Sequence, residues 1–258
     1  MNRYTPVFLI AVVAGGLTVT GCNKNAGHSN DGLNFHERQA LAAAEADAKP
    51  NMLEQSASLA EEVFWRLPKR AIELMRGDSA GDAAAKLRSP NPADRRMALL
   101  DLASRDFGGQ EDYVTVYTGY AQGDPDPTVR AAALRALNLT NSGEPVLFVE
   151  SLADDEPLVR LEAAKALAKR PTTEAVTPLM TLVENRTEDV DIRIAAADAL
   201  KHYPQIYVAR RLANLVGDRD FSVAWQAGQS LRYLTGQDYD YQPGQWLMFL
   251  SESEKPFG

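Results

Sequence analysis

The chain has 258 residues, of which 45% are hydrophobic and 24% charged. This composition is ordinary for a soluble globular protein and allows a core of useful size. The net charge of −8 lacks the basic balance typical of nucleic-acid-binding proteins, so no nucleic-acid partner is expected. The single cysteine excludes an intramolecular disulfide.

Residues 1–21 have the pattern of a signal peptide. A basic start at Arg3 precedes an apolar run over residues 7–20, which is too short to span a hydrocarbon core of ~30 Å as a helix. The run ends in Val-Thr-Gly before Cys22 and resembles the bacterial lipobox, whose cysteine is lipidated and becomes N-terminal. The resemblance implies a lipoprotein anchored through diacylglycerol and palmitate on Cys22. An incidental cysteine, or cleavage by ordinary signal peptidase, is the alternative.

Asn23 follows the cysteine in place of the aspartate that often retains lipoproteins in the inner membrane. We therefore expect the chain in the cell envelope, on the outer membrane and facing the periplasm. Residues 22–50 are polar and small, which favours a flexible tether. The two histidines of this stretch, His28 and His36, are expected to be solvated.

Residues 51–90 are predicted to form an N-terminal helical cap. Leu59, Val63, Phe64 and Leu67 fall on one helical face, and a third short helix is expected to end at Leu87. A solenoid needs such an end unit, with a polar outer surface.

The sequence then repeats one motif at intervals of about 30 to 35 residues. Clear copies occupy residues 126–137, 156–167 and 189–200, and weaker copies surround Arg95 and Ala224. Each clear copy has an acidic residue, an arginine four positions later, and then alanines and a leucine at fixed spacing. A fixed period in this range predicts stacked helix pairs.

Each motif has the pattern of an amphipathic helix. Val129, Ala133, Ala136 and Leu137 form one stripe of a 3.6-residue period, and the acidic residue stands at the N-cap position. Proline follows the cap in two of the three clear copies, at Pro127 and Pro157. The expected caps are Asn91, Asp126, Asp189 and Asp220, with Glu156 as a weaker substitute.

A polar turn and a second apolar helix follow each motif, and no stretch predicts a strand. The pattern resembles the HEAT repeat, in particular the short bacterial kind also seen in phycobilisome-lyase-like proteins, over residues 92–250. The resemblance implies an all-α fold, a right-handed α–α superhelix of helix pairs.

The HEAT resemblance also implies a polar ladder between neighbouring repeats. Its expected members are Arg130, Arg160 and Arg193 with Asp126, Glu156 and Asp189. Arg95 is expected to contribute less, since its copy lacks the acidic cap, and Ala224 fits a last repeat with no successor. The alternative for these arginines is anion binding.

The chain shows no motif of a known active site or cofactor site. Acidic residues recur in pairs near the helix starts, but their spacing is not that of an EF-hand loop, so capping is preferred to calcium binding. We therefore expect no enzyme activity, no metal and no cofactor. The expected function is a membrane-anchored scaffold that binds a protein partner. The alternative is a lyase-like or enzyme-accessory protein that binds a small ligand in the concave groove.

Residues near the C-terminus are expected to close the stack. A Leu-Thr-Gly turn, an acidic-aromatic stretch and a last helix resemble the closing segment of exported bacterial HEAT proteins, with Trp246 and Phe249 folded against the last pair. An aromatic cage is the functional alternative. Residues 251–258 are expected to be a polar tail.

The HEAT resemblance implies that the second helices of the pairs line the concave face of the stack. Positions of these helices outside the apolar stripe are then the candidate binding residues, and tyrosine and arginine often carry interface energy. A merely solvated helix face is the alternative. The predicted row is Thr177, Thr181, Tyr207, Arg210 and Asn214, extended by Tyr113 and Tyr117.

Overall fold

The computed structural model describes residues 62–64, 66 and 81–257, which belong to one compact unit. Regular structure in residues 81–257 is helical, without strands. The helices are α4 (Gly81–Leu87), α5 (Pro92–Ala103), α6 (Glu111–Gly123), α7 (Pro127–Leu139), α8 (Pro145–Ser151), α9 (Pro157–Leu167), α10 (Val176–Glu184), α11 (Val190–Leu200), α12 (Ile206–Leu215), α13 (Phe221–Thr235) and α14 (Pro243–Glu252). Cys22, the tether and most of the N-terminal cap lie outside the described residues.

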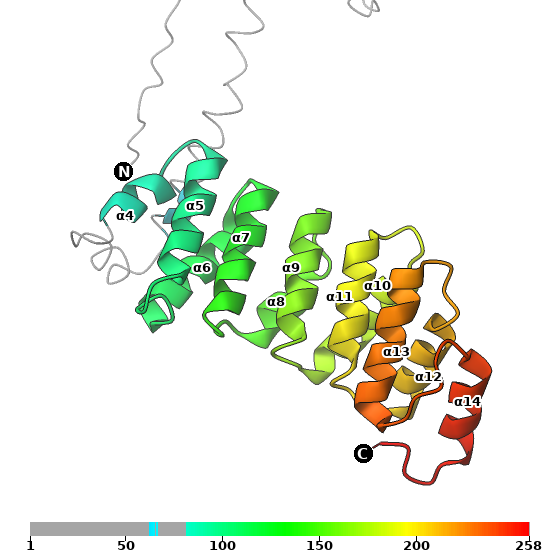
Figure 1. The fold of residues 1–258 in the computed structure, drawn as a ribbon. Coiled ribbons are helices and arrows are strands. Elements are labelled where there is room, and N and C mark those ends of the chain that lie inside the picture. Colours follow the sequence, from blue (N-terminus) through cyan, green and yellow to red (C-terminus); the bar gives the residue numbers. More distant parts are fainter. Residues whose placement is uncertain (1–61, 65, 67–80, 258) are drawn as a thin grey trace, which may run out of the picture. The chain divides into compact units, whose positions relative to one another are not determined.

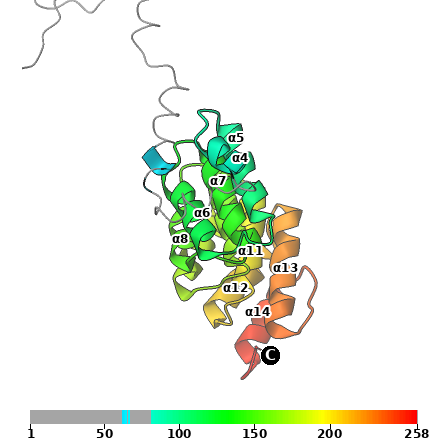
Figure 2. The ribbon, with the colours of Figure 1, turned by 90° about the vertical axis from the view of Figure 1, so that its left-hand side faces the viewer.

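The helices form two rows, as the all-α solenoid requires (Figures 1 and 2). One row contains the helices of the repeated motif, α5, α7, α9, α11 and α13, and each packs directly against the next. We call these the motif helices. The second row contains α6, α8, α10 and α12. The predicted fold class is therefore confirmed. Within the described segments, no helix combines the length and apolar content that a membrane crossing requires.

Side-chain caps explain where the motif helices begin. Asp126 accepts a hydrogen bond from the backbone N–H of Thr128 at 2.8 Å, which satisfies one of the free donors of the first turn. Asn91, Asp189 and Asp220 make the equivalent bond in their own helices. Glu156 stands at the N-cap of α9 but makes no side-chain bond there, in keeping with the preference of this position for shorter polar side chains.

The helix pairs differ from the predicted order. A motif helix packs more extensively on the second-row helix before it than on the one after it: α7 on α6, and α11 on α10. Loop length alone does not set this pairing, because residues 185–189 before α11 and residues 201–205 after it are equally many. Each repeat therefore consists of a second-row helix followed by a motif helix.

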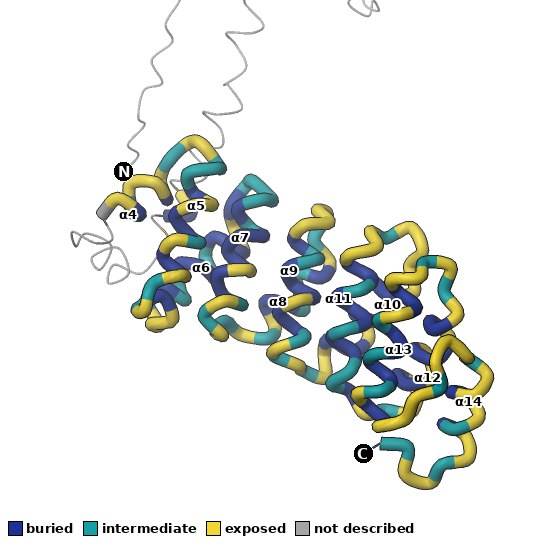
Figure 3. The backbone as a smooth tube through the Cα atoms, viewed as in Figure 1, coloured by how far each residue is buried: buried dark blue, intermediate teal, exposed yellow. Residues whose placement is uncertain are grey.

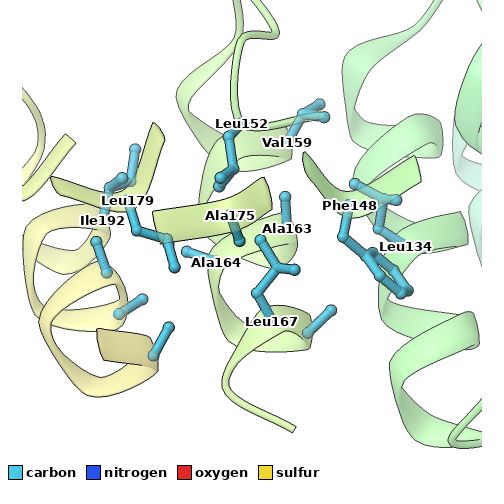
Figure 4. Close-up of a cluster of buried hydrophobic side chains, with 14 of the residues drawn as sticks. Leu134, Phe148, Leu152, Val159, Ala163, Ala164, Leu167, Ala175, Leu179 and Ile192 are labelled. Carbon is cyan, nitrogen blue, oxygen red and sulfur yellow. The ribbon is translucent and has the colours of Figure 1, made fainter. Parts of the chain in front are cut away.

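One continuous hydrophobic core lies between the rows (Figures 3 and 4). Ala163 and Ala164 of α9 are fully buried. In the view of Figure 4, Leu167 lies below them, and Phe148 and Leu134 lie to their right. Alanine at these positions lets adjacent motif helices approach closely, which is why the motif row is the tighter of the two.

Helix α14 closes the stack by packing on α12. Trp246 is fully buried, and its indole Nε1–H donates to the carbonyl oxygen of Asp240 at 3.1 Å. The rings of Tyr239 and Trp246 meet edge to face at 5.0 Å, and Tyr239 also contacts Phe249. The expected packing of Trp246 and Phe249 is thus confirmed. Trp246 presents no open ring face, while Tyr239 and Phe249 line a surface hollow of about 350 Å³ beside α14.

Candidate interaction surface

Arginines of the motif helices link each repeat to the next. Arg130 donates from Nε and Nη2 to the two carboxylate oxygens of Asp154, at 3.0 and 2.8 Å. Its Nη1 donates to the carbonyl oxygen of Asp124, before its own helix. Arg160 repeats the geometry with Glu188, at 2.9 and 2.8 Å. Arg193 pairs with Asp218 at 2.6 Å. A ladder of two-point ion pairs therefore runs along the stack.

The acidic members of the ladder differ from the predicted ones. Asp126 and Asp189 turn their side chains onto their own helices as caps, and Glu156 is exposed. The arginines instead bind loop carboxylates that lie one or two residues before the cap residue. Each of these also accepts the backbone N–H of the cap residue, as Asp154 does from Glu156 at 3.0 Å. The prediction of Asp126, Glu156 and Asp189 as ladder acids was wrong, since the carboxylates that reach the arginines are Asp154, Glu188 and Asp218.

The expectation for Arg95 was also wrong. Arg95 and Asp124 have side chains that are 0% exposed, and two bonds of 2.8 Å join them. The third nitrogen, Nη1, donates to the carbonyl oxygen of Ser89 at 2.9 Å. The acidic partner comes from the next repeat, so the missing acid at Asn91 does not matter. This is the most buried pair of the ladder.

Electrostatics agree with these bonds. The hydrogen bond from Arg160 lowers the pKa of Glu188, against the effect of burial. Burial would raise the pKa of Asp154 and of Asp218, but bonds and charge from Arg130 and Arg193 outweigh burial, and both pKa values lie below the usual range. The ladder arginines are thus bound by the fold rather than free for an anion. Among the described residues, no cluster of His, Cys, Asp or Glu could hold a metal.

The predicted binding row is split by the structure. Tyr113 and Tyr117 of α6 are buried in the core, and burial raises the pKa of Tyr117 above its usual range. They cannot extend a binding row. The remaining members are exposed on the adjacent helices α10 and α12: Thr177, Thr181, Tyr207, Arg210 and Asn214.

The second row is also not the inner row. Helices on the inside of a curved stack lie closer together than helices on the outside. Close packing between neighbours runs through the motif helices, whereas in the second row α10 against α12 is the main neighbour contact that the structure describes. The expectation that second helices line the concave face was therefore wrong, and the inner surface belongs to the motif helices.

The outward side of the motif helices is a distinct surface. It is formed by the second, fifth, sixth, ninth and thirteenth residues after each cap, which fall within an arc of about 100° opposite the core. We call it the motif face. Leu139 on α7 is 60% exposed, and each motif helix adds at least one exposed large apolar side chain on or beside this face, the others being Met97, Leu158, Val190, Phe221, Trp225 and Tyr233. The motif periodicity already places these residues on one side of each motif helix, whereas the predicted binding row lies on the second helices.

A hollow of about 300 Å³ lies in the motif face across α5, α7 and α9. Its lining includes Ala131 and Ala132 of α7, at positions where α5 has Arg96 and Met97. Because α7 has alanine at both positions, the surface is lower there than on its neighbours. The remaining lining residues are Arg96, Leu100, Thr128, Arg135, Leu158 and Glu162.

Comparison with known families agrees with this architecture. Residues 144–232 match the family model for HEAT repeats. The matched stretch runs from α8 into α13, so it begins with a second-row helix and ends in a motif helix. No curated protein matches the chain. The match and the helical stack together support a HEAT-repeat protein, a type that commonly serves as a scaffold for protein interactions.

Proposed function

We propose that the chain is a scaffold that binds a protein partner on the motif face. The observation that carries this proposal is the concentration of exposed apolar side chains on the motif helices, from Met97 on α5 to Tyr233 on α13. Exposed apolar side chains cost free energy in water, and their concentration on one side of a helical stack favours an interaction surface there. The match to HEAT repeats supports the same function.

We further propose that a lipid on Cys22 anchors the scaffold on the exported side of a bacterial membrane. The proposed membrane is the outer membrane, and the scaffold would face the periplasm. The sequence supports this through the order of basic start, apolar run and lipobox before Cys22. The polar residues 23–50 would give the stack a reach of about 30 Å as a flexible coil. A partner would then be held near the membrane surface.

The test of the binding face places a photo-crosslinking amino acid at single positions of the full chain in cells. Leu158 on the motif face and Thr177 on α10 are both exposed and lie on neighbouring repeats, so they form a matched pair. We expect a discrete crosslinked protein from position 158 and none from position 177. The captured protein, identified by mass spectrometry and purified, must then bind the chain and lose affinity for Leu158→Asp. Capture from position 177 alone would place binding on the second row and contradict the proposal.

A further inference from the structure

The motif face has an uneven distribution of charge. On α5, α7 and α9 it carries Arg96, Arg135 and Lys165, and Lys169 follows just beyond α9. On the motif face of these three helices the carboxylate is that of Glu162, which is buried. On α11 the same face carries Asp191 and Asp198. A chain of net charge −8 therefore presents a basic region around the hollow.

Most of this positive charge is available to a partner. Glu162 is 2% exposed and binds two of the cations, Arg135 at 2.7 Å and Lys165 at 3.3 Å, so one carboxylate is shared between two bases. Among the described residues, Arg96 and Lys169 have no hydrogen-bond or ion-pair partner from their side chains. Asp101 of α5 lies off the face and is paired with Arg105.

The hollow between these cations is apolar at its base. Ala131 and Ala132 lie on α7, Leu100 approaches from α5 and Leu158 from α9. Its volume of about 300 Å³ gives room for an apolar side chain. Arg96 and Arg135 line the same hollow. If a partner inserted a side chain here, the residues next to it in the partner's sequence would lie close to these two guanidinium groups.

We propose that this hollow binds an acidic segment of a protein, with an apolar side chain inserted over Ala131 and Ala132 and carboxylates placed near Arg96 and Arg135. The inference rests on the proposed scaffold function and names its partner class. Charge complementarity fits an acidic segment, and desolvated apolar anchors supply most interface energy. A nucleic acid fits less well, because its evenly spaced phosphates would meet the exposed Asp191 on α11, where Asp198 is already paired with Lys201.

The test selects ligands from a random peptide display library on the full chain. We expect enriched peptides in which aspartate or glutamate flanks a leucine, methionine or aromatic residue. Binding of a selected peptide should fall roughly fivefold to tenfold for Arg96→Glu, and it should weaken as salt screens the charges. Leu158→Ser should also weaken it.

The matched control is Arg210→Glu on α12. Arg210 is exposed and has no ion-pair partner from its side chain among the described residues, so this variant changes the net charge equally while leaving the motif face intact. Binding should change less than about twofold. Circular dichroism melting of each variant shows whether the stack is preserved.

Several outcomes would overturn the inference: no enrichment, enrichment of basic peptides, or equal sensitivity to Arg96→Glu and Arg210→Glu. Tighter binding of a single-stranded oligonucleotide than of the peptide would assign the face to nucleic acid. A chromophore that co-purifies with the chain and competes with the peptide would assign the hollow to a small ligand. A partner crosslinked from position 158 without acidic enrichment would refute this inference and leave the proposed scaffold function standing.

Discussion

Removal of Arg95 should destabilise the stack strongly. Arg95→Ala deletes both bonds to Asp124 and the bond to the carbonyl oxygen of Ser89. The Asp124 carboxylate is 0% exposed, so it would remain buried without its counter-charge. Breaking one partner of a buried pair costs about 3–5 kcal/mol. For a unit of this size, that corresponds to a fall in melting temperature on the order of 10 °C.

The neighbouring residue provides the control. Arg96 is exposed and unpaired within the described structure, so Arg96→Ala should change the free energy of unfolding by less than about 0.5 kcal/mol. The assay is urea denaturation of the purified chain, followed by circular dichroism. Asp124→Ala in the Arg95→Ala background should recover part of the loss, since the uncompensated carboxylate is then absent. Equal effects of Arg95→Ala and Arg96→Ala would refute the ladder as a source of stability.

Two further predictions concern acid and lipid. Asp154, Glu188 and Asp218 have pKa values below their usual 3.8 and 4.5 in the folded chain, so their contribution is full at neutral pH and is lost as the pH falls through the folded values. The free energy of unfolding should therefore decline below about pH 4.5, and Glu188→Gln should make this decline shallower; a flat profile down to pH 3 would contradict the assignment. Labelled palmitate should enter the wild type in bacterial cells and be absent from Cys22→Ser, and persistent labelling of the variant would exclude lipidation at this residue.

The repeat was readable from sequence because each motif combines three local signals. Asp126 caps its helix, Val129 and Leu137 mark the buried stripe, and Arg130 recurs at a fixed offset. These features depend on residues close in sequence, and the structure confirms the helices and their caps. The contact of the arginines with a neighbouring repeat was implied by the HEAT resemblance, and Arg130 makes it with Asp154.

The partners of those arginines could not be chosen from sequence alone. Asp124 and Asp126 are both within reach of a repeat junction, and the choice depends on which carboxylate faces the preceding motif helix. The burial of Tyr117 was similarly ambiguous, because an aromatic residue on a helix fits a core or an interface equally well. The hollow over Ala131 and Ala132 arises from three helices together, so it has no signature in any one of them.

Oxidative footprinting of the complex tests the central claim that a protein partner covers the motif face. Met97, Trp225 and Tyr233 are exposed on this face, and Tyr207 and Met248 are comparably exposed on α12 and α14. With the crosslinked partner bound to the full chain, we predict slower oxidation at one or more of the first three and unchanged oxidation at Tyr207 and Met248. Protection of Tyr207 and Met248, with Met97, Trp225 and Tyr233 unchanged, would contradict the account and place the partner on α12 and α14.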